Sequence, residues 1–284
     1  MIRCRDVYRV HPGWLSVMSL SPSILYRRPL PIICAASLSL CFGLSPSPLQ
    51  GQDSASSRSS DPSNSASVSG GDPSVDGVLK QILAGNRRFV SGKLQHPHES
   101  RHWRKQLEAG QHPVAVVVGC SDSRVTPELI FDQGLGDLFV VRVAGNIVDT
   151  DVVASVEYAV DHLDTHLIIV LGHSGCGAVT AALEHAAEST SEPDEVVSLL
   201  YRIEPALREI PASLSQDERL QQAIANNVER SAERLSHVPD LMKSLKKGRA
   251  VIVGAIYDMH SGNVEVISRI DREGHHRLQV ANEN

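Results

Sequence analysis

The 284-residue chain has no surplus of basic residues. It carries 27 Lys and Arg against 33 Asp and Glu, which gives a formal net charge of -6. Proteins that bind nucleic acid normally present a basic face, so this charge balance argues against such a partner. The chain also lacks a Gly-x-Gly-x-x-Gly run, a phosphate-loop motif and any internal repeat. The sequence therefore offers no support for a nucleic-acid partner, a nucleotide cofactor or a repeat architecture.

A hydrophobic run of membrane-spanning length is missing as well. Arg27 and Arg28 are followed by an apolar stretch from Leu30 to Leu44, which is shorter than the roughly 20 residues that a spanning helix needs. Basic residues ahead of a short apolar stretch are typical of a secretory signal. We therefore expect residues 1–51 to be a signal peptide, with Met18 as the candidate start, and the mature protein to be periplasmic or secreted without a membrane span. An uncleaved N-terminal anchor is the alternative.

A Ser-rich tract separates this N-terminal segment from the rest of the chain. Residues 52–74 contain too little apolar surface to offset the entropy of ordering, so we expect a disordered linker there. The folded domain is expected to span residues 75–284. Only two of the five cysteines, Cys120 and Cys176, fall within that domain.

The pattern of apolar residues in this domain alternates between strands and helices. Four apolar runs predict buried strands: Val114–Val118, Leu138–Val143, Leu167–Leu171 and Ala250–Ile256. Helical periodicity is found over residues 75–90, 151–163, 177–187 and 216–236. A turn at residues 261–263 leads into a further strand, Val264–Ile270. The predicted fold class is α/β, with a mainly parallel four-stranded sheet, an added edge strand and flanking helices.

Unusual residues follow the first and third of these strands. The first loop reads Cys120-Ser-Asp122-Ser-Arg124, and the second reads His173-Ser-Gly-Cys176. Sites on open α/β sheets form where loops leave the carboxyl ends of the strands, so neighbouring strands would bring these residues together. Two thiolates and one imidazole suit Zn²⁺, and three protein ligands leave the open position that is typical of catalytic zinc. The sequence thus predicts a zinc site made by Cys120, His173 and Cys176.

The glycines of the second loop also fit a crowded site. Gly172, Gly175 and Gly177 would let the backbone approach the metal without side-chain obstruction. A simpler alternative is that Cys120 and Cys176 form a disulfide or are buried thiols.

Asp122 and Arg124 alternate with Cys120 along an extended segment and so could share its side. Asp122 could orient a water molecule or hydroxide on the zinc, or it could ligate the zinc itself in a closed form of the site. Arg124 would hold the carboxylate away from the metal through a bidentate hydrogen bond. An ordinary structural ion pair is the alternative.

These residues closely resemble the β-class carbonic anhydrases. The resemblance includes the two loop segments, Cys120–Val125 and His173–Val179. It extends to Leu138–Arg142 followed by Ala144–Asn146, and to Gly85–Phe89. It implies an N-terminal helical arm that embraces a second subunit, a homodimer or higher oligomer, and active sites at the dimer interface. The zinc-ligand roles fall on Cys120, His173 and Cys176.

The same resemblance suggests a substrate pocket of the plant-type branch. It assigns substrate binding to Gln111, Phe139 and Tyr158, although each could also be an ordinary loop or core residue. Another branch has a non-catalytic bicarbonate site that requires a Trp where this chain has Val117. We therefore expect an accessible metal site without that switch.

The predicted function is the zinc-dependent, reversible hydration of carbon dioxide to bicarbonate and a proton. The nucleophile would be zinc-bound hydroxide oriented by Asp122 and Arg124. One alternative is hydrolysis of carbonyl sulfide or carbon disulfide on the same fold. Others are a non-catalytic zinc- or bicarbonate-binding protein and a disulfide-stabilised interaction module.

Overall fold

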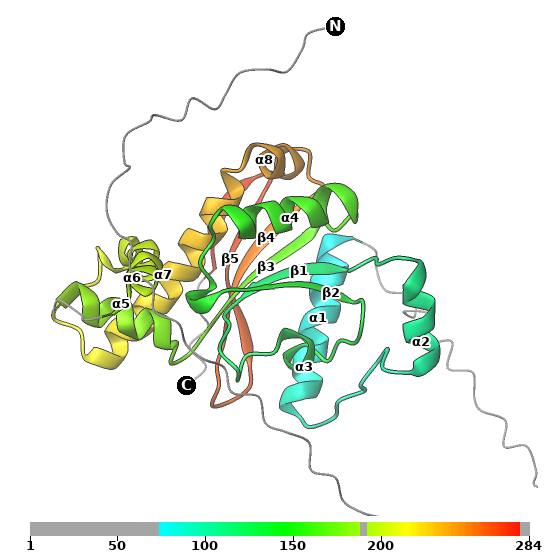
Figure 1. Cartoon of the computed structure of the whole chain (residues 1–284), viewed down its shortest axis with the longest axis horizontal. Coiled ribbons are helices and arrows are strands. Elements are labelled where there is room, and N and C mark those ends of the chain that lie inside the picture. Colours follow the sequence, from blue (N-terminus) through cyan, green and yellow to red (C-terminus); the bar gives the residue numbers. More distant parts are fainter. Residues whose placement is uncertain (1–73, 188–191, 279–284) are drawn as a thin grey trace, which may run out of the picture. The chain divides into compact units, whose positions relative to one another are not determined.

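The computed structural model describes residues 74–187 and 192–278 (Figure 1). All of them belong to the unit Asn64–Asn284. The predicted signal peptide and nearly all of the predicted linker lie outside the described residues, so those two expectations stay predictions.

A six-stranded sheet with the order β2-β1-β3-β4-β5-β6 forms the centre of the domain. Its strands are β1 Ala115–Gly119, β2 Leu138–Arg142, β3 Leu167–His173, β4 Val251–Tyr257, β5 Val264–Asp271 and β6 Gly274–Arg277. The first four are parallel, and β5 and β6 add to the edge in antiparallel fashion. The predicted parallel sheet with an added edge strand is confirmed. The sixth strand was not predicted, because its residues Gly-His-His-Arg are mostly exposed and show no apolar pattern.

Helices fill the connections between the strands. The structure has α1 Val75–Val90, α2 Arg101–Gln106, α3 Pro127–Ile130, α4 Thr150–His162, α5 Gly177–Ala187, α6 Asp194–Ile203, α7 Gln216–Ser236 and α8 Pro239–Lys246. In the described part of the chain they are joined by three short 3₁₀ helices: η1 Leu107–Ala109, η2 Ala144–Asn146 and η3 Glu204–Leu207. The four predicted helices begin and end within one residue of their expected bounds. For α7 the start is fixed by a capping box, in which Ser215 and Glu218 satisfy each other's backbone N–H groups.

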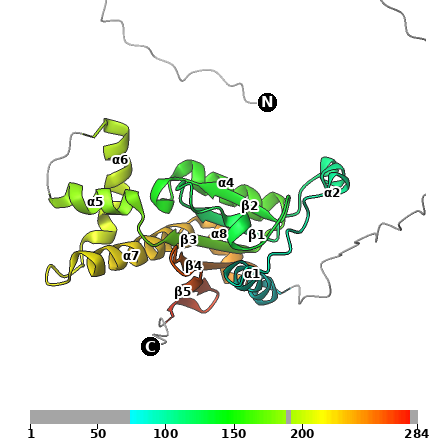
Figure 2. The ribbon, with the colours of Figure 1, turned by 90° about the horizontal axis from the view of Figure 1, so that it is seen from below.

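The helices pack on both faces of the sheet. One face packs against α4, α7 and α8, whereas α1 and α3 cover the other. Figure 2 shows α4 and α1 on opposite sides of the strands. The central strands β1 and β3 are buried along their whole length, which explains why their sequences are continuous apolar runs. Within the described ranges, no helix is long and apolar enough to cross a bilayer.

The first helix is anchored to the sheet of its own chain. Ile82 is buried among the core residues on the face of the sheet that α1 and α3 cover. The buried Asn86 donates to the carbonyl oxygens of Ile130 and Gly262 and accepts from the N–H of Val264. A Cβ on Gly85 would lie 1.8 Å from the carbonyl oxygen of Phe131, so only glycine fits there. The segment Gly85–Phe89 therefore serves the packing of α1. By contrast, α2 has no buried residue, and the expected arm around a second subunit stays a prediction.

Candidate metal centre

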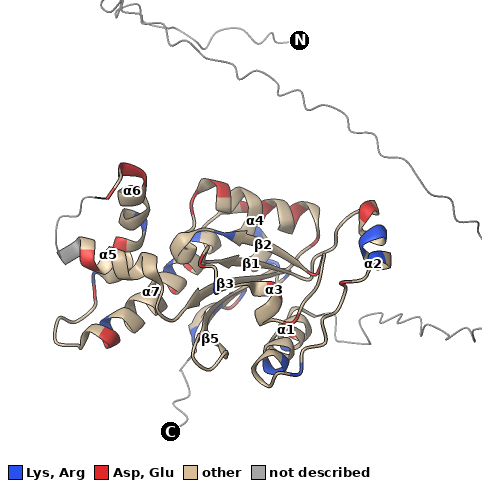
Figure 3. Cartoon of the chain, turned by 60° about the horizontal axis from the view of Figure 1, so that its bottom comes forward, with Lys and Arg blue, Asp and Glu red and all other residues tan. Residues whose placement is uncertain are grey.

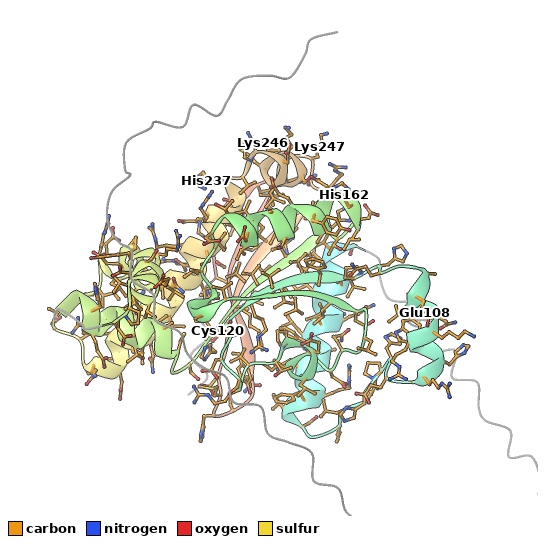
Figure 4. All side chains as sticks on the ribbon, viewed as in Figure 1. Glu108, Cys120, His162, His237, Lys246 and Lys247 are labelled. Carbon is orange, nitrogen blue, oxygen red and sulfur yellow. The ribbon has the colours of Figure 1, made fainter. Side chains whose placement is uncertain are left out.

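The two predicted ligand loops meet at the carboxyl edge of the sheet. Strands β1 and β3 are parallel neighbours with Gly119 opposite Leu171, so Cys120 emerges beside the end of β3. The ligand atoms of Cys120, His173 and Cys176 all lie within 4.8 Å of one another, and all three residues are buried. Figure 4 shows Cys120 at the end of the sheet that faces α5, α6 and α7. Both thiols are free in this structure, so the sulfurs do not form the alternative disulfide.

The imidazole of His173 is oriented as a metal ligand would be. Its Nδ1 lies 3.0 Å from the carbonyl oxygen of Ser174, and a carbonyl can only accept, so Nδ1 carries the proton. Nε2 is then an acceptor, and within the described chain this buried atom has no hydrogen-bond partner. Buried polar atoms without partners are rare and call for an explanation. A metal ion held through Nε2, with the second nitrogen fixed by a carbonyl, supplies one.

The two thiols form a closely coupled pair. A hydrogen bond from Cys176 is the main cause that lowers the pKa of Cys120, despite its burial. The N–H groups of Asp122 and Gly145 also donate to the Cys120 sulfur, at 3.4 and 3.3 Å. The pKa of Cys176 is raised, first by the same pairing with Cys120 and then by burial.

The start of α5 acts in the opposite direction, since the N–H groups of Ala178 and Val179 lower the pKa of Cys176. The helix terminus thus favours the Cys176 thiolate, but the neighbouring Cys120 outweighs it. Two thiolates can coexist here only beside a cation, and a coordinating cation deprotonates a thiol outright. Two sulfurs, one available imidazole nitrogen and close spacing therefore fit Zn²⁺.

Asp122 is held by Arg124 rather than by the cluster. The guanidinium donates from Nε to Oδ1 at 2.9 Å and from Nη2 to Oδ2 at 2.7 Å, and the Arg124 N–H donates to Oδ1 at 3.0 Å. The Arg124 side chain holds the pKa of this carboxyl well below its usual range. Asp122 is therefore an ionised acceptor beside the site, and it is not one of the three clustered ligands.

Several residues that position the ligands were not assigned roles from the sequence. Arg142 donates from Nε to the carbonyl oxygen of Cys120 and from Nη2 to that of Asp122, at 2.9 and 2.6 Å, and so fixes the backbone of the first loop. Gly145 adopts a φ of 67° and presents its N–H to the Cys120 sulfur. Asn227 of α7 in turn donates to the carbonyl oxygen of Gly145 at 2.7 Å. The Ala144-Gly145-Asn146 motif signals this turn, but only the fold shows its target.

The three glycines of the second loop differ in their reasons. A Cβ on Gly172 would lie 2.4 Å from Cγ2 of Val228, so the close approach of α7 requires glycine there. Gly175 has a φ of 63°, in the left-handed region that favours glycine. A Cβ on Gly177 would meet no heavy atom within 4 Å. Two positions therefore require glycine for packing or backbone conformation, and the third has no steric basis for it within the described chain. The expected approach of the backbone to a metal stays a prediction.

The predicted substrate residues do not meet the metal cluster within one chain. Phe139 pairs with Val116 in the register of the sheet, and its ring lies 6.3 Å from that of Tyr158. Val116 precedes Cys120 by four residues, which is about 13 Å along a strand at 3.3 Å per residue. Gln111 is exposed and lies ahead of the amino end of β1. These three residues therefore lie toward the opposite end of the strands from the metal ligands.

The sheet is mainly parallel and flanked by helices, and a buried Cys-His-Cys cluster lies at its carboxyl edge. These features define the class: an α/β protein with a candidate metal-binding site built from strand-end loops. A family model described as carbonic anhydrase matches residues 115–264. Carbonic anhydrase 2 of Mycobacterium tuberculosis is 40% identical over 196 residues, which cover 69% of this chain and 94% of the relative. The carbonic anhydrase of Mycolicibacterium smegmatis is 40% identical over 192 residues, covering 67% and 92%.

Solved structures agree with these relatives. A tetrameric β-carbonic anhydrase from Sordaria macrospora matches with a TM-score of 0.55 and 27% identity, covering 66% of this chain and 96% of that one. The Coccomyxa β-carbonic anhydrase matches with a TM-score of 0.56 and 26% identity, covering 68% and 88%. The chain belongs to the β-carbonic anhydrase family.

Proposed function

We propose that this protein catalyses the reversible hydration of carbon dioxide to bicarbonate and a proton. The observation that carries the proposal is the buried cluster of Cys120, His173 and Cys176, whose sulfur and nitrogen atoms suit Zn²⁺. Membership of the carbonic anhydrase family supports the same reaction. Zinc, when bound, supplies a Lewis acid that brings the pKa of water toward neutrality.

In this proposal Asp122 orients the attacking oxygen. Both carboxylate oxygens accept hydrogen bonds from Arg124, and the resulting ionised carboxylate keeps lone pairs that can accept a further hydrogen bond from water. An acceptor fixed on one side of the nucleophile directs the remaining lone pair toward carbon dioxide. Arg124 has the positioning role, because it restrains Asp122 and keeps its charge. Release of Asp122 from Arg124 would allow the closed form, in which the carboxylate reaches the metal.

We further propose that the complete pocket belongs to two chains. Gln111, Phe139 and Tyr158 lie away from the metal cluster of their own chain, and Tyr158 is 49% exposed although it is a large aromatic residue. In a two-fold dimer each chain can contribute the same patch to the site of its partner. These three residues would then line the apolar slot for carbon dioxide beside the partner's metal ligands. A homodimer or a higher oligomer follows from this arrangement.

Mixed dimers test this shared pocket. A chain with Cys176→Ser and a chain with Gln111→Ala should each form poorly active homodimers. Co-expression should restore about a quarter of the wild-type activity, since random pairing gives half heterodimers with one intact site each. Recovery above the mean of the two homodimers supports the proposal, whereas a mixture no better than that mean contradicts it.

The activity itself is tested by carbon dioxide hydration and by oxygen-isotope exchange between carbon dioxide and water. Turnover of carbonyl sulfide and carbon disulfide should be measured on the same zinc-loaded sample. Fast carbon dioxide turnover with slow turnover of the sulfur gases supports the proposal. Preference for a sulfur gas would assign the alternative hydrolase activity, and bound zinc without isotope exchange at alkaline pH would indicate a non-catalytic binding protein.

We also propose that the protein is exported to the periplasm or beyond the cell. The support is the sequence pattern alone, in which Arg27 and Arg28 precede the apolar stretch Leu30–Leu44. Fractionation of cells that express the full chain should place a shortened protein outside the cytoplasm. A full-length protein in the cytoplasmic fraction would contradict export.

A further inference from the structure

A small pocket lies between α6, α7 and the segment that follows η2. Its volume is about 130 Å³, and it is lined by Ile147, Val148, Arg202, Asn227, Arg230, Ser231 and Arg234. None of the three clustered metal ligands belongs to this lining. In Figure 3 the carboxyl end of α6 and the part of α7 beside it both carry basic positions. The pocket is therefore separate from the candidate metal centre.

The charge of the pocket is positive and largely uncompensated. Among the residues that the structure describes, three arginines line it and no acidic residue does. Arg202 reaches Asp149 only at 3.5 Å, with both side chains more than a third exposed. Arg230 and Arg234 make no ion pair or hydrogen bond with any part of the chain that the structure describes. All three arginines are exposed, so solvent screens part of their mutual repulsion, and an anion between them would offset the remainder.

The floor of the pocket is rigid and polar. Asn227 and Ser231 are 3% and 5% exposed, and they lie one turn apart on α7. Asn227 donates to the carbonyl oxygen of Gly145, and Ser231 donates to that of Asn146 at 3.0 Å. These bonds fasten α7 to η2. Arg230 and Arg234, each three residues after one of these anchors, therefore project from a fixed part of the helix. A preorganised base reduces the entropy that a ligand must overcome on binding.

We propose that this pocket binds a small tetrahedral oxyanion of the phosphate type. A volume of about 130 Å³ gives room for one small inorganic oxyanion and is well below the roughly 300–1,000 Å³ that is typical of pockets for drug-sized ligands. A guanidinium group can donate two parallel hydrogen bonds to two oxygens of such an ion. A doubly charged ion also neutralises more of the charge of three arginines than chloride does. The chemistry shared by phosphate and sulfate defines the ligand class.

Calorimetric titration of the zinc-loaded full chain with inorganic phosphate tests the proposal. Sulfate is titrated as a second arm, and sodium chloride of equal ionic strength serves as the reference. We expect phosphate to bind at one ion per chain. The variant Arg230→Gln/Arg234→Gln should bind about a hundredfold more weakly, at about tenfold for each arginine. The charge-matched double variant Arg101→Gln/Arg104→Gln, on the exposed face of α2, should bind like the wild type.

Phosphate bound at the metal would lose affinity in Cys176→Ser, which removes a metal ligand. Phosphate bound at the arginines should keep its affinity in that variant and lose it in Arg230→Gln/Arg234→Gln, while the zinc content of the arginine variant stays that of the wild type. Equal affinity in the wild type and the double arginine variant would overturn the proposal. So would the absence of binding at millimolar phosphate, which would mean that these arginines are simply solvated. A sulfate affinity equal to that for phosphate would leave the oxyanion class intact, whereas an equal response to chloride would overturn it.

Discussion

Gly172 is the position at which packing and metal binding are most directly coupled. It immediately precedes His173 and faces α7, where a Cβ would lie 2.4 Å from Cγ2 of Val228 and 3.6 Å from Cγ2 of Ile224. Carbon atoms normally approach to about 3.5–4.0 Å. Gly172→Ala must therefore push α7 and the end of β3 apart by about 1 Å.

The expected cost follows from this overlap. Overpacking of a well-packed core costs about 1–3 kcal/mol, and the buried position of Val228 leaves little room for relaxation. We expect the free energy of unfolding to fall by about 2–3 kcal/mol. Because His173 moves with its strand, zinc affinity should fall by about 10- to 100-fold, the range typical of a disturbed ligand support. Urea unfolding and competition with a chelating indicator measure the two quantities.

Val228→Ala provides the decisive second variant. On its own it removes two buried methyl groups and should cost about 2 kcal/mol. Combined with Gly172→Ala it removes the clashing atom, so the double variant should be more stable than the sum of the single effects predicts and should regain zinc affinity. Gly177→Ala, which meets nothing within 4 Å, is the control for adding a methyl group to this loop. A Gly172→Ala protein as stable as the wild type, or strictly additive effects in the double variant, would refute the reasoning.

Three further predictions concern single side chains. Cys176→Ser should lose most of its zinc on dialysis, measured as metal per chain; full retention would contradict its role as a ligand. Asp122→Ala should keep zinc but lower carbon dioxide hydration by about 10²- to 10⁴-fold, and near-normal oxygen-isotope exchange would discard the orienting role. Burial acts to raise the pKa of Asp132, but hydrogen bonds from Arg88 and two backbone N–H groups outweigh it, and the pKa is lowered. Asp132→Asn should therefore destabilise the protein by about 2–3 kcal/mol at pH 7. A carboxyl whose pKa is lower in the folded protein stabilises the fold above its unfolded pKa of about 4, and this stabilisation is lost as the pH falls below that value, so the difference in unfolding free energy between variant and wild type should shrink from pH 5 to pH 3. A pH-independent difference would contradict the charge argument.

The sequence predicted those parts of the fold and site that depend on local pattern. Strands β1 and β3 are buried on both faces, so their continuous apolar runs could be recognised as strands. Cys120 directly follows β1 and His173 is the last residue of β3, and loops at the carboxyl ends of neighbouring parallel strands lie close together. The order of the strands in the sheet was needed only to confirm that β1 and β3 are neighbours.

The remaining features depend on contacts between distant segments. Gly145 reaches the Cys120 sulfur, and Asn227 supports Gly145, across separations of 25 and 82 residues, and no local pattern encodes such pairs. The same holds for the arginine-lined pocket, because its three arginines come from two different helices and in sequence look like ordinary solvated residues. Gln111, Phe139 and Tyr158 could be singled out by resemblance, but their distance from the metal ligands became visible only in the folded chain.

Zinc K-edge X-ray absorption on the purified protein tests the central claim most directly. If Cys120 and Cys176 supply sulfur and His173 supplies nitrogen, the spectrum should show two sulfur neighbours at about 2.3 Å and the remaining light-atom neighbours at about 2.0–2.1 Å, with one zinc per chain. A site without sulfur neighbours, or active protein in which the two cysteines are bonded to each other and no zinc is bound, would contradict it.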